Sequence, residues 1–349
     1  MADAPVEALT RTLRGWSEAG RYLCLGARPG VRWPGGAAAW TAWTPLADHA
    51  VTLGAAGLRM VEEGAWGGDY DGVAVLVPGP RATTDAWTAA ALRAARPGGA
   101  VVVCGARDLG GPRAADQLVA LAGGGSVEGL RHCRVGAVVR PALLSDGIAA
   151  LASADAPLAF QGGPLRVRPG MFSADGLDTG SALLARTLPT DLRGIVVDLG
   201  AGWGWLSSSI LAKNPGVTTL HLVERDTRAL ALAVENLAGL PVVPHAADAT
   251  TWRLAGGADA VVMNPPFHDL GATSPALGVA FVEVAADLLR PSGVLWMVAN
   301  AHLPYERALR ARFRRVVEVA SEAGFKVLTA FEPVASDGVR HRAAPRGRG

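Results

Sequence analysis

The sequence predicts an α/β protein built from two tandem Rossmann-like domains that arose by duplication. Three observations support this prediction. The chain has 349 residues, which suits two domains better than one. Short apolar runs alternate with helix-like stretches, as in a parallel sheet. Three landmarks of the second half recur in the first half in the same order, which indicates an internal repeat.

The second half carries the clearer strand pattern. Its apolar runs are "GIVVDLG", "TTLHLVE", "ADAVVMN" and "SGVLWMVAN". Between them lie stretches such as "DTRALALAVENLAG", in which apolar residues recur at helical spacing before a closing glycine. Near the end, "RRVVEVASEAGFKVLTAF" reads as two strands joined at 322–324, which predicts an antiparallel hairpin. The sequence therefore favours a mostly parallel sheet that ends in a hairpin.

The first half repeats this plan more faintly. "RYLCLGARPG" resembles the first strand and its glycine turn, and "YDGVAVLVPGP" resembles "ADAVVMNPPF". "ALRAARPGGAVVVCG" resembles "AADLLRPSGVLWMVA" closely. Gly and Pro cluster at 161–172, where we place the boundary. The predicted domains are 1–160 and 161–335, followed by a basic, disordered tail at 336–349 that contains four arginines.

Composition excludes several classes of protein. Half of the chain is apolar and only 18% is charged, which argues against global disorder. The three cysteines are far apart, so neither a disulfide framework nor a zinc site is expected. The N-terminus lacks an apolar signal core, and no apolar run reaches about 18 residues. We therefore expect a cytoplasmic protein without a metal and without a membrane partner. The composition does not predict its oligomeric state.

The stretch "VVDLGAGWGWLSSSIL" runs from a strand through a glycine turn into a helix. Gly200, Gly202 and Gly204 let backbone N–H groups and the helix N-terminus approach a ligand closely. Asp198, just before them, can accept a hydrogen bond from an amine or a cation. An ordinary tight turn would look similar, so this stretch alone is a weak signal.

Two acids follow later strands. Glu224 ends the next strand, about twenty residues after the turn, where an acid typically accepts both ribose hydroxyls of a nucleoside. Asp248 follows a third short apolar run and is placed to contact an adenine amine. A solvated acid at a strand end is the alternative interpretation of each.

The sharpest signal is "NPPFH", Asn264 to His268, at the end of the fourth strand. The lone pair of an exocyclic amine is delocalised into its ring, so the amine is a poor nucleophile. The side-chain carbonyl of Asn264 and the backbone carbonyl of Pro265 can accept both N–H bonds and free that lone pair. Phe267 can stack on the ring and hold it in place. A proline-rich turn that merely ends a strand does not require Asn and Phe beside the prolines.

With these motifs together, the segment at about 170–330 resembles a class I S-adenosylmethionine-dependent methyltransferase of the N-methylating, NPPF-bearing type. The stretches "MFSADGLDTGSALL", "NPPFHDLG", "VANAHLPY" and "FKVLTA" are similar to the ribosomal RNA guanine-N2 methyltransferases, a group that includes small subunit methyltransferase C and its large-subunit relative. The resemblance implies a catalytic domain with a seven-stranded sheet and a degenerate methyltransferase-like domain before it.

The resemblance also implies residue roles. The cofactor S-adenosylmethionine would be held by Asp198, Gly200, Gly202, Glu224, Asp248 and Asn264. The target base would be held by Asn264, Pro265 and Phe267. His268 and Asp178 are weaker candidates for substrate contact, since a plain loop and a helix entrance explain them equally well. Trp203 and Trp205 in the glycine loop are bulkier than the family pattern suggests.

The expected reaction is methyl transfer from S-adenosylmethionine to the N2 amine of a guanine in ribosomal RNA, with the small subunit favoured. Alternatives are a large-subunit guanine, adenine N6 or a protein glutamine, and a ribosome-assembly factor that binds RNA without turnover. The partner is ribosomal RNA or a ribosomal subunit. A cluster of arginines at 307–315 is either a phosphate-binding surface or a solvated helix face.

The first half is expected to have lost the cofactor site. Cys24 stands where the second half has Asp198, and "GARPG" replaces the glycine turn. Val77 stands where the second half has Asn264 when the two sequences are laid side by side. We therefore expect this domain to dock RNA or to stabilise the catalytic half.

Overall fold

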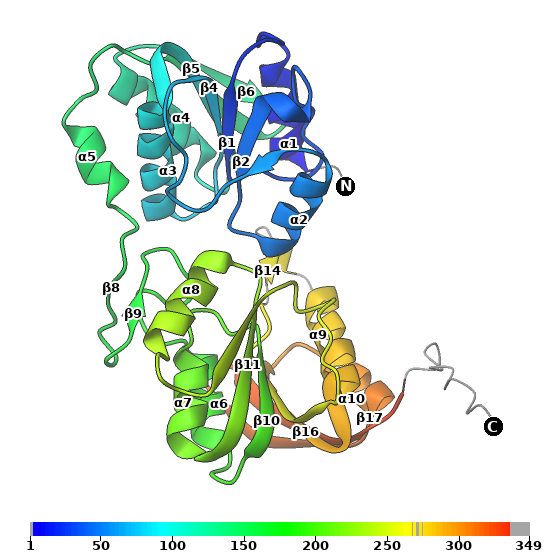
Figure 1. The fold of residues 1–349 in the computed structure, drawn as a ribbon. Coiled ribbons are helices and arrows are strands. Elements are labelled where there is room, and N and C mark those ends of the chain that lie inside the picture. Colours follow the sequence, from blue (N-terminus) through cyan, green and yellow to red (C-terminus); the bar gives the residue numbers. More distant parts are fainter. Residues whose placement is uncertain (1–2, 267, 270–271, 274, 336–349) are drawn as a thin grey trace, which may run out of the picture. The chain divides into compact units, whose positions relative to one another are not determined.

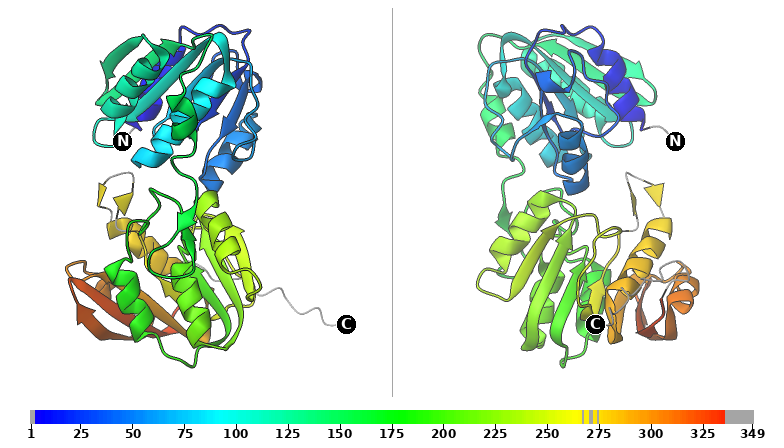
Figure 2. Two further views of the ribbon diagram at one scale, coloured as in Figure 1. Left: turned by 90° about the vertical axis from the view of Figure 1, so that its left-hand side faces the viewer. Right: turned by 45° about the vertical axis from the view of Figure 1, so that its right-hand side comes forward.

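The computed structural model describes residues 3–266, 268–269, 272–273 and 275–335. It contains two compact units, and each has a sheet covered by helices on both faces (Figures 1 and 2). The first unit extends to Gly176 and also includes Arg225–Leu232. The second begins at Leu177. The predicted tail at 336–349 lies outside the described residues.

The first unit contains a seven-stranded sheet in the order β3-β2-β1-β4-β5-β7-β6. Its strands are β1 (Tyr22–Leu25), β2 (Trp40–Trp43), β3 (Arg59–Met60), β4 (Tyr70–Leu76), β5 (Ala95–Ala106), β6 (Ser126–Leu130) and β7 (Cys133–Val139). Its helices are α1 (Ala4–Leu13), the 3-10 helix η1 (Ala37–Ala39), α2 (Ala47–Ala55), α3 (Arg81–Ala94), α4 (Gly111–Ala122) and α5 (Gly147–Ala152). A short ladder of β8 (Leu158–Ala159) and β9 (Arg166–Val167) follows.

The second unit contains a sheet in the order β12-β11-β10-β13-β16-β18-β17. Its strands are β10 (Arg193–Leu199), β11 (Gly216–Glu224), β12 (Val242–Ala246), β13 (Ala258–Met263), β16 (Leu289–Asn300), β17 (Phe313–Glu322) and β18 (Phe325–Pro333). Its other elements are α6 (Thr179–Thr187), α7 (Trp205–Lys213), α9 (Pro275–Leu288), α10 (Glu306–Arg312) and the short strands β14 (His268–Asp269) and β15 (Ala272–Thr273). Helix α8 (Thr227–Asn236) is divided between the units, since its residues up to Leu232 belong to the first and those from Ala233 to the second.

The two sheets have the same strand order when each strand is matched to its counterpart, which confirms the predicted duplication. In each sheet the first five strands pair in parallel, and the last two pairings, with and beyond the sixth strand, are antiparallel. The predicted hairpin joins β17 and β18 through Ala323 and Gly324, whose φ angles are 50° and 83°. Successive left-handed residues give a turn whose twist matches that of the flanking strands.

Apolar packing holds each sheet between its helices. In the second unit, the largest cluster of buried side chains joins Val197, Val261 and Leu295 of the sheet to Phe281 of α9 and Leu309 of α10. The near-continuous apolar strands are those expected of a parallel sheet covered on both faces. In the described parts of the chain, no helix has the length and apolar character needed to cross a membrane.

The structure separates Arg312 from the other arginines of the predicted cluster. Its side chain is 5% exposed and forms ion pairs with Glu283 and Asp287 of α9, the latter at 2.5 Å. Its guanidinium also donates to the carbonyl oxygens of Glu283 and Val334. Arg310, on the same helix, is exposed. Arg312 is therefore a structural residue that ties α10 to α9, and it is not part of a phosphate-binding surface.

We expect Arg312→Ala to lower the free energy of unfolding by roughly 2–4 kcal/mol, because its loss leaves two carboxylates and two carbonyls without their buried donor. Arg310→Ala is the matched control and is expected to change stability by less than about 0.5 kcal/mol. Urea unfolding of both variants measures the difference. Equal midpoints for the two variants would contradict the structural role of Arg312.

Candidate functional site

The candidate site lies at the carboxyl ends of three neighbouring strands of the second unit. Asp198 on β10 pairs in register with Leu222 on β11 and with Val262 on β13. Glu224 and Asn264 each lie two residues beyond those partners. Because parallel strands end at one edge of the sheet, these three polar residues share the place where open α/β sheets bind ligands.

Asp198 is a buried acid with an incomplete set of partners. Its side chain is 1% exposed, and its Oδ2 accepts a hydrogen bond from the Ser207 hydroxyl at 2.5 Å. Its Oδ1 is buried and has no hydrogen-bond partner among the described residues. Burial raises the pKa of Asp198 to about 7, and the charge of Glu224 adds to the rise while Ser207 opposes it. A buried acceptor in this state fits a ligand that brings a donor or a positive charge.

The glycine turn between β10 and α7 has the backbone that the sequence suggested. Gly200, Gly202 and Gly204 have φ angles of 87°, 55° and 90°, in the left-handed region that favours glycine. The N–H of Gly202 donates to Glu224 Oε2 at 2.9 Å. At Gly204 a Cβ would lie 3.1 Å from the Cβ of Ala233, so α8 packs directly on the turn. Glu224 thus braces the turn at the start of α7.

The two bulky residues of the turn have different environments. Trp203 is buried, and its carbonyl oxygen accepts a hydrogen bond from Asn236 Nδ2 at 2.9 Å. Trp205 is half-buried and is the first residue of α7. Their bulk is therefore compatible with the glycine backbone, because Trp203 is accommodated in the interior.

Asp248 is half-buried after β12 and closes a local turn. Its Oδ1 accepts hydrogen bonds from the backbone N–H and the hydroxyl of Thr250, at 2.8 and 2.7 Å. β12 lies next to β11 at the edge of the sheet. This position agrees with a base-binding role, although the turn alone accounts for the two hydrogen bonds.

The side-chain amide of Asn264 is held in one orientation. Its Nδ2 donates to Asp178 Oδ2 at 2.9 Å and to the Ser181 hydroxyl oxygen at 2.8 Å. A carboxylate can only accept, so the group facing Asp178 must be the NH₂. Asn264 Oδ1 is buried and has no hydrogen-bond partner among the described residues. The amide therefore presents a fixed, unused acceptor.

Asp178 has a role that sequence reasoning only partly found. It is the N-cap of α6, where its Oδ2 accepts from the Ser181 N–H at 2.6 Å. The same carboxylate holds Asn264, which lies 86 residues later in the chain. Ser181, in the stretch "FSADGLDTGS", is like Asp178 a sequence candidate for closing over the cofactor or target, with an ordinary helix entrance as the alternative. In the structure, both Asp178 and Ser181 accept hydrogen bonds from the side-chain amide of Asn264.

The structure describes only part of the rest of "NPPFH". Pro265 is buried directly after Asn264. The backbone of His268 and Asp269 pairs with β15. Phe267, and the side chain of His268, lie outside the described residues. Among the described residues, no group of three or more His, Cys, Asp and Glu side chains is arranged to hold a metal ion.

Comparison with known proteins identifies the family. Residues 163–329 match the family model "Methyltransferase small domain". The ribosomal RNA small subunit methyltransferase C of Shewanella loihica is 32% identical over 261 residues, covering 72% of this chain and 74% of that protein. The Pseudomonas paraeruginosa protein of the same name is 33% identical, covering 76% and 80%. The chain belongs to the ribosomal RNA small subunit methyltransferase C family.

A solved structure extends the likeness to both halves of this methyltransferase. The 16S rRNA N2 methyltransferase of T. thermophilus, in complex with AdoMet and guanosine, has a TM-score of 0.78 and 27% identity. The match covers 95% of this chain and 92% of that one. The duplicated architecture is therefore shared with that relative.

The first unit lacks the acceptors of the second. Cys24 pairs with Ala42 on β2 and with Ala74 on β4. Asp198 pairs in the same way with the corresponding strands β11 and β13, so Cys24 occupies the register position of Asp198. The same register places Leu76, rather than Val77, opposite the position of Asn264. The prediction of Val77 was one residue off, because β4 runs one residue further than the proline motif suggested. Both residues are apolar, so the acceptor is absent in either case.

We expect Ser181→Ala to lower kcat for methyl transfer about tenfold, because one of the two acceptors that orient Asn264 is lost. Cofactor affinity is expected to stay within about twofold. Thr187→Ala is the matched control on the same helix, since its hydroxyl donates to the Leu183 carbonyl within that helix. Steady-state kinetics and calorimetry on both variants test this. Equal kcat values for the two would remove Ser181 from the site.

Proposed function

We propose that this enzyme transfers a methyl group from S-adenosylmethionine to the exocyclic N2 amine of a guanine in small-subunit ribosomal RNA. The observation that carries the proposal is the oriented Asn264 amide, whose buried Oδ1 has no partner among the described residues. The names of the family members and the guanosine bound by the T. thermophilus relative support guanine as the target.

The residues present fit the cofactor. Asp198 Oδ1 is a buried acceptor without a partner among the described residues, which suits the ammonium group of the cofactor's methionine end. Gly200 and Gly202 leave room for close approach, Glu224 would accept from the ribose hydroxyls, and Asp248 would contact the adenine amine. When bound, S-adenosylmethionine supplies a methyl group on a positively charged sulfur, which makes that methyl electrophilic.

The chain's own contribution is placement and two fixed acceptors. Asn264 Oδ1 and the Pro265 carbonyl oxygen would accept the two N–H bonds of the target amine. As the amine attacks, its hydrogens become more positive, so fixed acceptors stabilise the transition state more than the ground state. We assign Phe267 to stacking on the base, and His268 to substrate contact.

The target guanine must leave its stack to reach this edge of the sheet, as base-modifying enzymes generally require. Adenine N6, a protein glutamine and a large-subunit guanine are less favoured targets, because both named relatives are small-subunit enzymes. The assembly-factor alternative is disfavoured because Asp198, Glu224 and Asn264 are all in place.

We further propose 161–335 as the catalytic domain and 1–160 as a methyltransferase-like domain that docks RNA. The partner would be ribosomal RNA or a small ribosomal subunit, which places the enzyme in the cytoplasm. The loss of the acceptors at Cys24 and Leu76 supports a non-catalytic role for the first domain.

Asn264→Ala is expected to lower kcat by about a hundredfold or more while leaving cofactor affinity nearly unchanged. The lost acceptor acts on the target amine and mainly in the transition state. A turnover assay on small-subunit substrate and calorimetry with S-adenosylhomocysteine measure the two effects. Near-normal turnover would remove the central residue from the mechanism.

Cofactor affinity is expected to rise roughly tenfold between pH 6 and pH 8, because the ionised fraction of Asp198 grows from about 0.1 to about 0.9 as pH passes its raised pKa of about 7. The ionised carboxylate is the form that attracts the cofactor's ammonium group. Asp198→Asn should bind more weakly and lose this dependence. A wild-type affinity that is flat over this range would contradict the role given to Asp198.

A further inference from the structure

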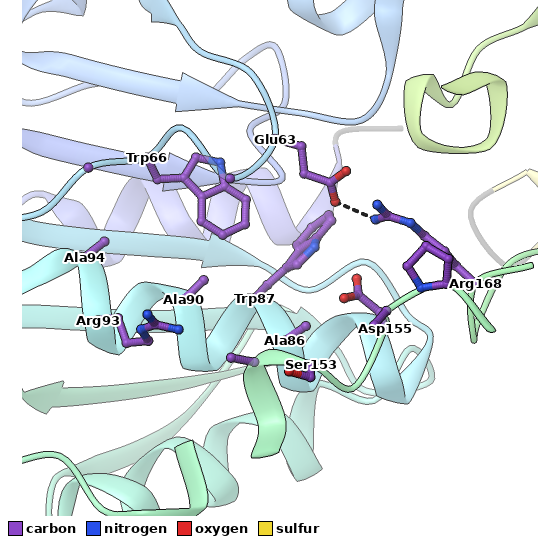
Figure 3. A pocket seen from close by; sticks show the side chains of 15 residues that line it. Glu63, Trp66, Ala86, Trp87, Ala90, Arg93, Ala94, Ser153, Asp155 and Arg168 are labelled. Carbon is purple, nitrogen blue, oxygen red and sulfur yellow. Dashed lines mark hydrogen bonds and ion pairs between the residues drawn. The ribbon is translucent and has the colours of Figure 1, made fainter. Parts of the chain in front are cut away.

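The first unit contains a cavity of about 490 Å³ that is lined by residues of that unit. It lies between α3, the segment that follows β3, and the segment that follows α5 (Figure 3). Trp66 and Trp87 line it together with Glu63, Asp155 and Arg168, and Arg93 contributes a further cation. The cavity combines flat aromatic surfaces with charged groups of both signs.

The two indoles leave donors unused. Trp87 is 2% exposed, and its Nε1 has no hydrogen-bond partner among the described residues. The same holds for Nε1 of Trp66. A buried N–H without an acceptor lowers stability, so two of them beside one cavity indicate a ligand that brings acceptors. Trp43 packs against both rings, at centroid distances of 4.9 and 5.5 Å, and holds them in place.

The carboxylates of the cavity accept hydrogen bonds, whereas the indole N–H groups donate them. Glu63 forms an ion pair with Arg168 at 2.8 Å. Asp155 lines the same space and forms no ion pair or side-chain hydrogen bond with another described residue (Figure 3). Burial raises the pKa of Asp155, and Arg168 partly opposes the rise. A ligand that donates N–H groups to Asp155 and accepts from the indoles would satisfy both sets of groups.

The position of the cavity in the fold also favours a purine-like ligand. β3 and β12 occupy the same edge position in the two sheets. The segment after β12 carries Asp248, which we assign to the cofactor's adenine. The segment after β3 carries Glu63 and Trp66, which line the cavity. The cavity therefore borders the part of the first domain that corresponds to the purine end of the cofactor site.

The methionine end of that site has no counterpart in the first unit. Cys24 is fully buried, and burial raises its pKa far above the usual range of a thiol, so it remains neutral. At Gly26 a Cβ would lie 2.6 Å from the Trp87 ring, so the indole occupies the space beside the turn. These features favour a base over the whole cofactor.

We propose that this cavity binds an aminopurine base, either an unstacked base of the RNA substrate or a free purine nucleotide. An aminopurine offers an exocyclic amine to Asp155, ring or carbonyl acceptors to the indoles, and a flat face for aromatic contact. The RNA-borne form rests on the proposed function, because it assumes an RNA substrate.

Calorimetry on the full chain tests the site directly. Asn264→Ala protein saturated with S-adenosylhomocysteine keeps the cofactor site filled and weakens the catalytic base pocket. We expect GMP or AMP to bind this protein, and IMP, which differs from GMP by the missing amine, to bind at least about tenfold more weakly. Adding Asp155→Asn or Trp66→Phe should lower the affinity about tenfold or more. Asp146→Asn, an exposed acid on the neighbouring segment, is the matched control and should not.

Steady-state kinetics distinguish a base that belongs to the RNA substrate from a free purine nucleotide. Asp155→Asn in otherwise unchanged protein should raise KM for small-subunit substrate with kcat unchanged if the base belongs to RNA. Loss of GMP affinity with unchanged KM assigns the cavity to a free nucleotide. No binding of GMP and AMP at millimolar concentration, or equal affinity in Asp155→Asn and Asp146→Asn, overturns the proposal. Failure of the wild type to methylate RNA would count against the proposed function alone, since the calorimetry does not depend on turnover.

Discussion

The orientation of one side-chain amide governs the catalytic half of the molecule. Asn264 follows a buried strand, and its NH₂ group is held by Asp178 and Ser181 at the start of α6. Both contacts are to acceptors, so the amide oxygen is left facing away from them without a partner among the described residues. The N-cap of α6 thereby serves two purposes, because the carboxylate that begins the helix also orients the side-chain amide of Asn264.

The candidate site buries polar oxygen atoms that lack hydrogen bonds within the described part of the chain, which lowers the stability of the folded protein. Asp198 and Asn264 each bury an oxygen that lacks a hydrogen bond in the described structure. Buried acceptors of this kind destabilise a protein unless a ligand supplies donors. Both residues lie at the ends of the adjacent strands β10 and β13, which is where the proposed function puts the cofactor and its target amine. The first domain keeps the sheet and replaces these positions with Cys24 and Leu76, which have no such cost.

The mostly parallel sheet, the late hairpin and the duplication could be predicted from the sequence, because strand periodicity and repeated segments are visible along the chain. The glycine turn and the proline motif are local signals too, so the strand ends that carry the candidate residues Asp198, Glu224 and Asn264 could also be predicted. The contact of Asp178 with Asn264 could not be predicted, since it joins residues 86 apart. Helical spacing likewise could not show that Arg312 is buried while Arg310 is exposed. The sequence placed the counterpart of Asn264 at Val77, one residue beyond Leu76, because sequence alone does not determine where a strand ends.

The most direct test of guanine N2 methylation uses the wild-type enzyme with tritiated S-adenosylmethionine and unmethylated small and large ribosomal subunits. After digestion of the RNA, the labelled nucleoside is identified and its position mapped. We predict label only in small-subunit RNA, recovered as N2-methylguanosine at one position. Label recovered in large-subunit RNA, in methyladenosine or in protein, or absence of label despite cofactor binding, would contradict this assignment.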